Sequence, residues 1–154
     1  MMLSGFDHVA VLTADLDAFV AFYVEVFGAL AEGRLADDGA EMVVLRIGPH
    51  SEINVFKVDG NDESTRQTPM FARGRLDHFG FRAASLEAFD VLRERLMQRG
   101  HTDGFVTDFG HVLSFFFRDP EGLEAEVCVG NPDATPGVVN PPGTPSSRYH
   151  ASRE

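Results

Sequence analysis

The sequence predicts an α+β protein built from two tandem β-α-β-β-β modules. Two observations carry this prediction: a segment of the chain repeats, and each copy joins one stretch of helical periodicity to several short apolar runs. At an offset of 70, residues 6–22 match residues 76–92 at six of seventeen positions. About one match is expected by chance at ordinary residue frequencies. The offset then becomes 72, as in the match of Arg46 to Arg118.

The first copy begins with an apolar, β-rich run at residues 8–12, which predicts a strand. Apolar residues at helical spacing predict a helix over residues 16–27. Asp15 is expected to cap its first turn, and Gly28 is expected to end it. The remaining strands of the copy are expected at 29–35, 41–47 and 52–58.

The second copy repeats this order. Residues 76–81 predict a strand, and residues 86–99 predict a helix that ends at Gly100. The remaining strands are expected at 104–107, 112–117 and 124–129. Residues 119–122, Asp-Pro-Glu-Gly, are typical of a tight turn and join the last two strands into a hairpin.

The domain organisation follows from the repeat. We expect one domain over residues 1–129, with a first module at about 5–58 and a second at about 76–129. A polar connection over 59–75 joins the modules. Residues 130–154 hold five of the eight prolines and show little periodicity, which predicts a flexible C-terminal tail.

Composition narrows the class of partner. The 154 residues are 44% hydrophobic, as in globular proteins, and carry a formal net charge of -11. That charge repels phosphate backbones and anionic lipids, so we expect a small-molecule partner and neither nucleic acid nor membrane. Cys128 is the single cysteine, and the N-terminal segment lacks a signal-peptide pattern, so we expect a cytoplasmic protein.

The repeat also selects candidate metal ligands. His8 and His78 occupy equivalent places in the two first strands, and Asn54 and Glu126 in the two last strands. Strand alternation and pseudo-twofold symmetry predict that both imidazoles and the Glu126 carboxylate meet at one point. Two histidines and one carboxylate suffice for Fe²⁺, which we expect first, or for Mn²⁺, Ni²⁺, Co²⁺ or Zn²⁺. The competing interpretation is two structural histidines hydrogen-bonded within their strands.

Other polar and aromatic residues are assigned supporting roles. His111 is the first choice as acid or base, because it precedes the strand expected to pair with that of Glu126. Tyr23 is a second candidate for catalysis, and Cys128 is expected to be a buried small hydrophobe. The expected cavity wall consists of Asn54, Phe56, Arg82 and Phe116.

The run FDHVAV…LDAFVAFYVEVFG…LDHFGF…FFFRDPEGLEAEV resembles the vicinal oxygen chelate superfamily over about residues 5–129. That group includes glyoxalase I, extradiol dioxygenases, fosfomycin-resistance transferases and bleomycin-sequestering proteins. The resemblance implies two modules that form a mixed-sheet, open-barrel-like metal cavity. It places His8, His78 and Glu126 at ligand positions, with Asn54 where glyoxalase I often has Glu or Gln. It also implies a homodimer.

The resemblance favours a metal-dependent enzyme that acts on a small molecule with vicinal oxygens, of extradiol-dioxygenase or lyase type. One alternative is a glyoxalase I-type lactoylglutathione lyase or isomerase, against which Asn54 counts. Another is a metal-free protein that sequesters a drug or metabolite, for which the acidic charge suits a cationic ligand. Retention of two histidines and one glutamate in register favours the enzyme.

Overall fold

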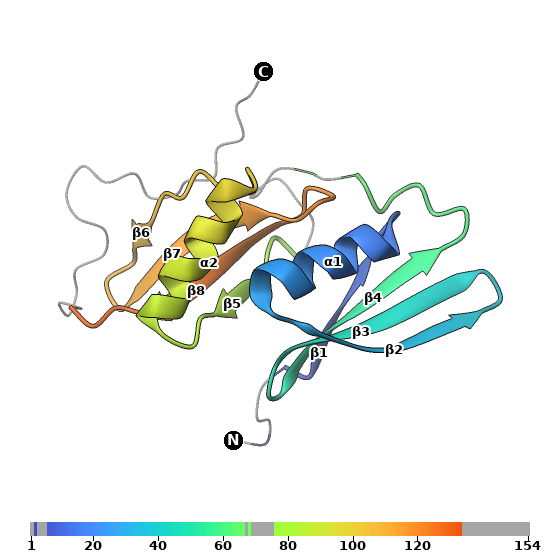
Figure 1. The fold of residues 1–154 in the computed structure, drawn as a ribbon, viewed down its shortest axis with the longest axis horizontal. Helices are drawn as coiled ribbons and strands as arrows, with labels where there is room; N and C mark the ends of the chain where they lie inside the picture. Colours follow the sequence, from blue (N-terminus) through green and yellow to red (C-terminus); the bar gives the residue numbers. More distant parts are fainter. Residues whose placement is uncertain (1, 3–5, 67, 69–75, 134–154) are drawn as a thin grey trace. The chain divides into compact units, whose positions relative to one another are not determined.

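The computed structural model describes residues 2, 6–66, 68 and 76–133 (Figure 1). The chain divides into two compact units, Met1–Gln67 with Pro120–Gly122, and Thr68–Asp119 with Leu123–Glu154. Each unit contains one β-α-β-β-β module with a mixed four-stranded sheet, so the predicted fold class is confirmed. That both modules form one domain stays a prediction.

The first unit follows the predicted order of elements. Its elements are β1 (His8–Leu12), α1 (Leu16–Phe27), β2 (Leu30–Asp37), β3 (Ala40–Gly48) and β4 (Ser51–Val58). The strands lie in the order β1-β4-β3-β2, with β1 parallel to β4 and the other neighbours antiparallel. The parallel pair brings the first strand beside the last strand, as the repeat requires for the candidate ligands.

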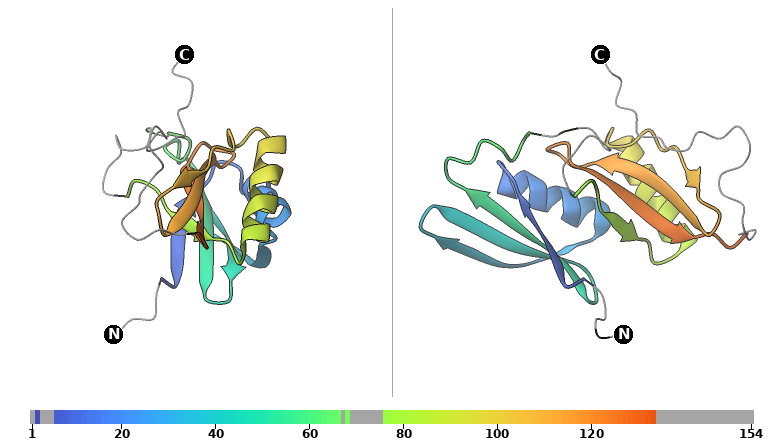
Figure 2. Two further views of the ribbon diagram at one scale, coloured as in Figure 1. Left: turned by 90° about the vertical axis from the view of Figure 1, so that its left-hand side faces the viewer. Right: turned by 180° about the vertical axis from the view of Figure 1, so that it is seen from behind.

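Helix α1 begins and ends where its sequence signals stand. The Asp15 carboxylate accepts a hydrogen bond from the Ala18 backbone N–H at 3.0 Å, and Gly28 closes the helix in the left-handed conformation with φ 70°. The helix packs on one face of the sheet (Figure 2), and its buried side chains meet Val43, Leu45, Ile53 and Val55 in the core. The opposite face of the sheet carries His8 and Asn54.

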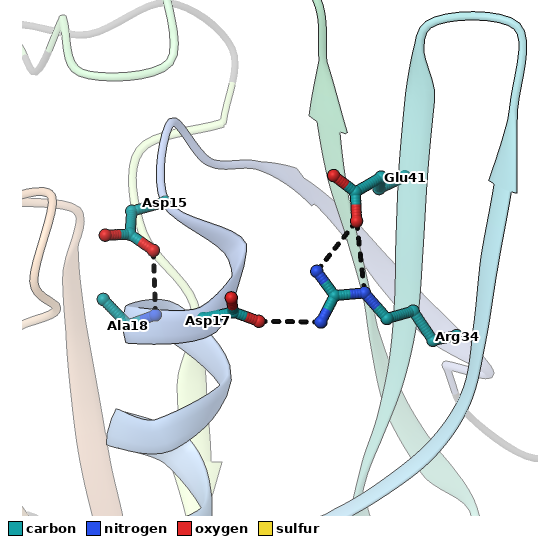
Figure 3. A network of polar contacts seen from close by, with 5 residues as sticks. All are labelled: Asp15, Asp17, Ala18, Arg34 and Glu41. Atoms are coloured by element: carbon teal, nitrogen blue, oxygen red, sulfur yellow. Dashed lines mark hydrogen bonds and ion pairs between the residues drawn. The ribbon is translucent and has the colours of Figure 1, made fainter.

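Strand β2 is exposed along its whole length and is tied to the unit by charge. The Arg34 guanidinium donates to Glu41 on β3 at 2.8 and 3.1 Å and to Asp17 on α1 at 2.7 Å (Figure 3). Its pairing with β3 shifts register between Glu32 and Arg34, where Gly33 adopts φ 58°. This bulge needs glycine, because a side chain at positive φ is strained.

The second unit repeats the topology on a smaller scale. Its elements are β5 (Gly80–Arg82), α2 (Leu86–Gln98), β6 (Thr107–Asp108), β7 (Val112–Arg118) and β8 (Glu124–Gly130). The strands lie in the order β5-β8-β7-β6, with β5 parallel to β8. Ser85 caps α2, and Phe89 of this helix packs edge-on against Phe115 of β7 with ring centroids 4.9 Å apart.

Three sequence expectations for the second unit are wrong in extent. The strand predicted at 76–81 is limited to Gly80–Arg82, which pair with residues 126–128 of β8. In this parallel register residues 76 and 77 lie beside the loop that precedes β8 and have no strand to pair with. The strand predicted at 104–107 is Thr107–Asp108. The predicted tail starts too early, since Gly130 belongs to β8 and Asn131 donates to the Gly110 carbonyl at 2.8 Å. Residues 134–154 of the predicted tail lie outside the described residues.

Candidate metal centre

The strand registers make the two units equivalent at the candidate ligands. In the second unit, Gly80 of β5 lies opposite Glu126 of β8. In the first unit, Ala10 of β1 lies opposite Asn54 of β4. The offsets of 70 and 72 read from the sequence are therefore the offsets of the structure. Glu126 and Asn54 occupy the same place in the two sheets.

His78 and Glu126 lie together in the second unit. The Nε2 atom of His78 is 3.6 Å from Oε1 of Glu126, and their side chains are 26% and 19% exposed. The His78 ring also packs edge-on against Phe116, with centroids 5.7 Å apart. The second unit thus brings this histidine and this carboxylate together, and their role as metal ligands stays a prediction.

An aspartate precedes each of the two histidines and binds its ring. Asp77 Oδ2 lies 2.7 Å from His78 Nδ1, and Asp7 Oδ1 lies 2.9 Å from His8 Nδ1. A carboxylate that accepts from Nδ1–H leaves the lone pair on Nε2, which is the arrangement found in metal-binding histidines. Sequence analysis missed both aspartates, although the Asp-His dipeptide is identical in the two copies.

Ser114 of β7 holds the second oxygen of Glu126. Its hydroxyl donates to Glu126 Oε2 at 2.6 Å, and the Ser114 side chain is wholly buried. The carboxylate is therefore bound through Oε2, while Oε1 is the oxygen near His78. Sequence analysis missed Ser114 as well. Its signal is its place on the Glu126 face of the adjacent strand, two residues before Phe116.

Asn54 differs from Glu126 in charge and in partners. Its Oδ1 atom is buried and has no hydrogen-bond partner among the described residues. Burial of an amide oxygen without a partner is costly, so this atom is a site at which a donor group from a ligand would be stabilised. That environment fits the predicted place of Asn54 in a cavity wall, which stays a prediction.

The three predicted ligands are divided between the units. His78 and Glu126 belong to the second unit, and His8 belongs to the first. Over residues 6–66 and 76–133, no three His, Cys, Asp or Glu side chains form a group able to hold a metal ion. The second unit by itself therefore supplies a pair of ligands.

Residues 5–127 match the model of the Glyoxalase/Bleomycin resistance protein/Dioxygenase superfamily. The chain belongs to this superfamily. No curated protein matches the chain significantly. The vicinal oxygen chelate resemblance seen in the sequence is thereby confirmed at the level of the superfamily.

Solved structures of the superfamily share this fold. A glyoxylase/bleomycin resistance protein/dioxygenase domain from Frankia sp. EAN1pec is 26% identical, with a TM-score of 0.71 over 85% of this chain and 95% of that one. The fosfomycin resistance protein FosX from Listeria monocytogenes, as a Glu-to-Gln mutant complexed with Mn(II) and 1S,2S-dihydroxypropylphosphonic acid, is 20% identical. Its TM-score is 0.62, over 86% of this chain and 98% of that one. The oxidase ChaP-H2 is 18% identical, with a TM-score of 0.62 over 85% of this chain and 96% of that one.

Three of the predicted cavity-wall residues lie on the sheet faces that carry the candidate ligands. Phe116 lies opposite Glu126, and Arg82 lies opposite Cys128, two residues along β8. Phe56 shares the Asn54 face of β4 in the first unit. Arg82 is exposed, whereas Phe116 is almost completely buried.

His111, the first residue predicted to be catalytic, does not lie beside Glu126 within the second unit. His111 precedes Val112, which pairs with Gly130, whereas Glu126 pairs with Phe116. That separation of five residues along β7 is about 17 Å. Tyr23 is 0% exposed in the core of the first unit, stacked on Phe19 and Phe27 at 4.7 and 5.4 Å.

Cys128 lies in β8, two residues after Glu126. Burial, and secondarily the negative charge of Glu126, raise the pKa of the Cys128 thiol from 9.0 to about 11. The thiol is therefore neutral at physiological pH and a poor nucleophile. Cys128 is expected from the sequence to be a buried small hydrophobe; it is only partly buried, and its neutral thiol accords with the absence of a nucleophilic role.

No helix among the described residues is both long and apolar enough to cross a membrane.

Proposed function

We propose that this chain is a metal-dependent enzyme of the glyoxalase/bleomycin resistance/dioxygenase superfamily, with a divalent metal bound by His8, His78 and Glu126. Its substrate is a small molecule with two neighbouring oxygens. The observation that carries the proposal is the Asp-bound histidine in both units, at 2.9 and 2.7 Å. In each histidine the bond at Nδ1 leaves the lone pair of Nε2 available to a metal. Glu126 Oε1 lies 3.6 Å from Nε2 of His78.

The donor set fits the proposed group. Two neutral imidazoles and one carboxylate are the ligands of facial sites for Fe²⁺ and related divalent ions, and three ligands leave coordination positions for substrate. Asn54 has a neutral amide oxygen where a fourth, charged ligand would stand, which favours a three-ligand site. The Listeria FosX structure, with Mn(II) and a vicinal diol phosphonate, supports a metal and a substrate of this class.

Such a metal, when bound, supplies Lewis-acid polarisation of two adjacent substrate oxygens and, for Fe²⁺, reaction with O₂. The chain's own residues orient the two histidine rings. Asp7 and Asp77 keep the Nδ1 protons of the histidines in place, so that both rings bind through Nε2. Phe116 packs against the His78 ring with the ring centroids 5.7 Å apart, which restricts how that ring can turn.

The class of reaction is proposed as extradiol-dioxygenase or lyase type. Support comes from the superfamily and from Asn54, whose amide does not match the fourth ligand expected of a glyoxalase I-type lyase. A homodimer is proposed on the superfamily resemblance alone, and sedimentation of the purified chain tests it.

The experiment that tests the proposed function is elemental analysis of protein purified without added metal or chelator. The His8→Ala/His78→Ala double variant is compared with wild type and with His50→Ala, an exposed residue in the turn between β3 and β4. We expect near-stoichiometric Fe, Mn, Ni, Co or Zn in wild type and in His50→Ala, and loss of metal in the double variant.

The identity of the metal then divides the reaction types. Iron indicates oxygen chemistry, and another divalent ion indicates Lewis-acid chemistry. If wild type binds no metal even after reconstitution with each of these ions, the enzyme proposal is overturned. A metal-free sequestering protein is then the better explanation.

A further inference from the structure

We propose that Ser114 and Gly80 are positioning residues that fix the Glu126 carboxylate so that it binds metal through Oε1 alone. This inference rests on the proposed function, because it concerns one of the three proposed ligands. It adds two residues of the second unit to the candidate centre and defines how one ligand coordinates.

Ser114 restrains one oxygen of the carboxylate. The hydrogen bond from its hydroxyl to Glu126 Oε2 is 2.6 Å long, which is within the range of strong bonds from a hydroxyl to a charged carboxylate. The Ser114 side chain is 0% exposed, so water does not compete at the hydroxyl. Oε2 is thereby engaged by the protein, and the orientation of the carboxylate plane is set from the β7 side.

Gly80 makes room for the other oxygen. A Cβ atom added at Gly80 would lie 3.0 Å from Glu126 Cγ and 3.1 Å from Oε1. Both distances are shorter than ordinary van der Waals contacts, so with alanine here the Glu126 side chain has to shift by a few tenths of an ångström. Gly80 has no positive φ, so what the glycine provides at this position is space and not an unusual backbone conformation.

The first unit shows the contrast. Ala10 stands at the position equivalent to Gly80, and it faces Asn54, whose side chain is one carbon shorter than that of Glu126. The methyl group of Ala10 leaves room for the shorter amide of Asn54. The absence of a side chain at Gly80 leaves room for the longer carboxylate of Glu126. The pair of residues in each unit therefore fills a similar volume, with an amide in the first unit and a carboxylate in the second.

The two restraints together have a chemical consequence. Oε1 lies 3.6 Å from His78 Nε2, so the carboxylate oxygen that Ser114 does not bind is the one beside the proposed histidine ligand. Coordination through one oxygen leaves one more position at the metal for substrate than coordination through both. Loss of either restraint is expected to lower metal affinity or to permit two-oxygen coordination.

The test is Mn²⁺ binding by wild type, Ser114→Ala and Gly80→Ala, measured from the electron paramagnetic resonance signal of unbound Mn²⁺. We expect each variant to bind about 10- to 100-fold more weakly, as for other groups that orient a metal ligand. Co²⁺ absorption spectra of the same proteins report coordination number, and we expect the band intensities of both variants to differ from wild type.

Two control variants separate positioning from general disturbance. Gly130→Ala adds a methyl group in β8 at a position with nothing within 4 Å. Thr107→Val removes a buried hydroxyl from the residue that pairs with Ser114. Both controls are expected to keep wild-type Mn²⁺ affinity and Co²⁺ spectra. Circular dichroism melting shows whether each variant is folded. If Ser114→Ala does not fold, Gly80→Ala alone tests the inference.

The outcomes distinguish failure of the positioning roles from failure of the proposed metal site. If wild type binds Mn²⁺, and Ser114→Ala and Gly80→Ala bind it within twofold of wild type and show the wild-type Co²⁺ spectrum, the positioning roles are overturned and the proposed metal site stands. If wild type binds neither Mn²⁺ nor Co²⁺, the positioning roles are overturned; if it also binds no Fe²⁺, Ni²⁺ or Zn²⁺ on reconstitution, the proposed metal site is overturned as well. Weakened binding and altered spectra in both variants, with unchanged controls, support the inference.

Discussion

His78 is held by Asp77 through a 2.7 Å contact between Nδ1 and Oδ2, in which both side chains are about one quarter exposed. The equivalent pair of His8 and Asp7 is 2.9 Å long, with the two side chains 47% and 95% exposed. Water competes more strongly for the exposed pair. The Asp77 pair therefore constrains its imidazole more firmly within its own unit.

Asp77→Asn is accordingly expected to weaken Mn²⁺ binding by about 10- to 100-fold, because the amide no longer accepts a charge-assisted bond from Nδ1. Asp7→Asn is expected to weaken it less. Titration with Mn²⁺ measures both. The control is Asp17→Asn, which loses the ion pair with Arg34 on the surface and is expected to bind as wild type does. Equal affinities for all four proteins would contradict the orienting role.

The Cys128 thiol is expected to resist alkylation. With a pKa of about 11, about one thiol in a thousand is ionised at pH 8 in the metal-free folded protein. The rate with iodoacetamide should rise about tenfold per pH unit and level off only near pH 11. In urea the plateau should move to about pH 9. A plateau near pH 9 in the folded protein would show that the thiol is not shielded.

The same shift predicts a direction for stability. The folded state retains the thiol proton to a higher pH than the unfolded state does, so this group's contribution is present below the ordinary pKa of 9.0 and is lost as pH rises towards 11. Cys128→Ala should therefore lose less stability than wild type between pH 9 and pH 11. Urea denaturation at a series of pH values measures the difference.

Tyr23→Ala should destabilise the protein by about 3 to 5 kcal/mol, because it removes a fully buried ring stacked on Phe19 and Phe27. Val24→Ala, on the adjacent exposed face of α1, should change the free energy of unfolding by less than about 1 kcal/mol. Urea denaturation compares them. Tyr23→Phe then tests the predicted catalytic role: a variant of wild-type stability that loses metal-dependent turnover would establish it.

The two helix caps offer a further prediction. Asp15→Ala and Ser85→Ala each remove the side-chain acceptor for a backbone N–H in the first helical turn, and each should cost about 1 kcal/mol. Ser85→Asp keeps an acceptor and should retain stability. Thermal unfolding measures the three. An equal loss in Ser85→Asp and Ser85→Ala would show that the effect does not arise from the cap.

Local signals in the sequence predict most of the fold. The bounds of α1 are those expected, because Asp15 and Gly28 specify them chemically. The long hairpin strands are predicted to within one residue, since apolar runs and turn residues mark both ends. Strand β5 is shorter than predicted: its register leaves residues 76 and 77 without a partner strand, and no local sequence signal marks Gly80 as its first residue.

The candidate centre is predicted in part. The repeat predicts the equivalence of Asn54 with Glu126, and the registers confirm it. The hydrogen bond from Ser114 requires knowledge of which residues face each other on β7 and β8, which the sequence does not specify. His111 directly precedes β7, the strand that pairs with β8, but it lies at the end of β7 that pairs with Gly130 and not with Glu126. Membership of a hairpin does not imply nearness within it.

The bulge at Gly33 has a consequence for how copies of this chain meet in concentrated solution. Strand β2 lies at one edge of its sheet, and edges of this kind add strands from other molecules and seed aggregation. The bulge breaks the regular spacing of backbone groups, and Glu32 and Arg34 place charges on either side of it. Regular pairing with a second edge is therefore penalised, which protects the first unit against accidental fibre growth.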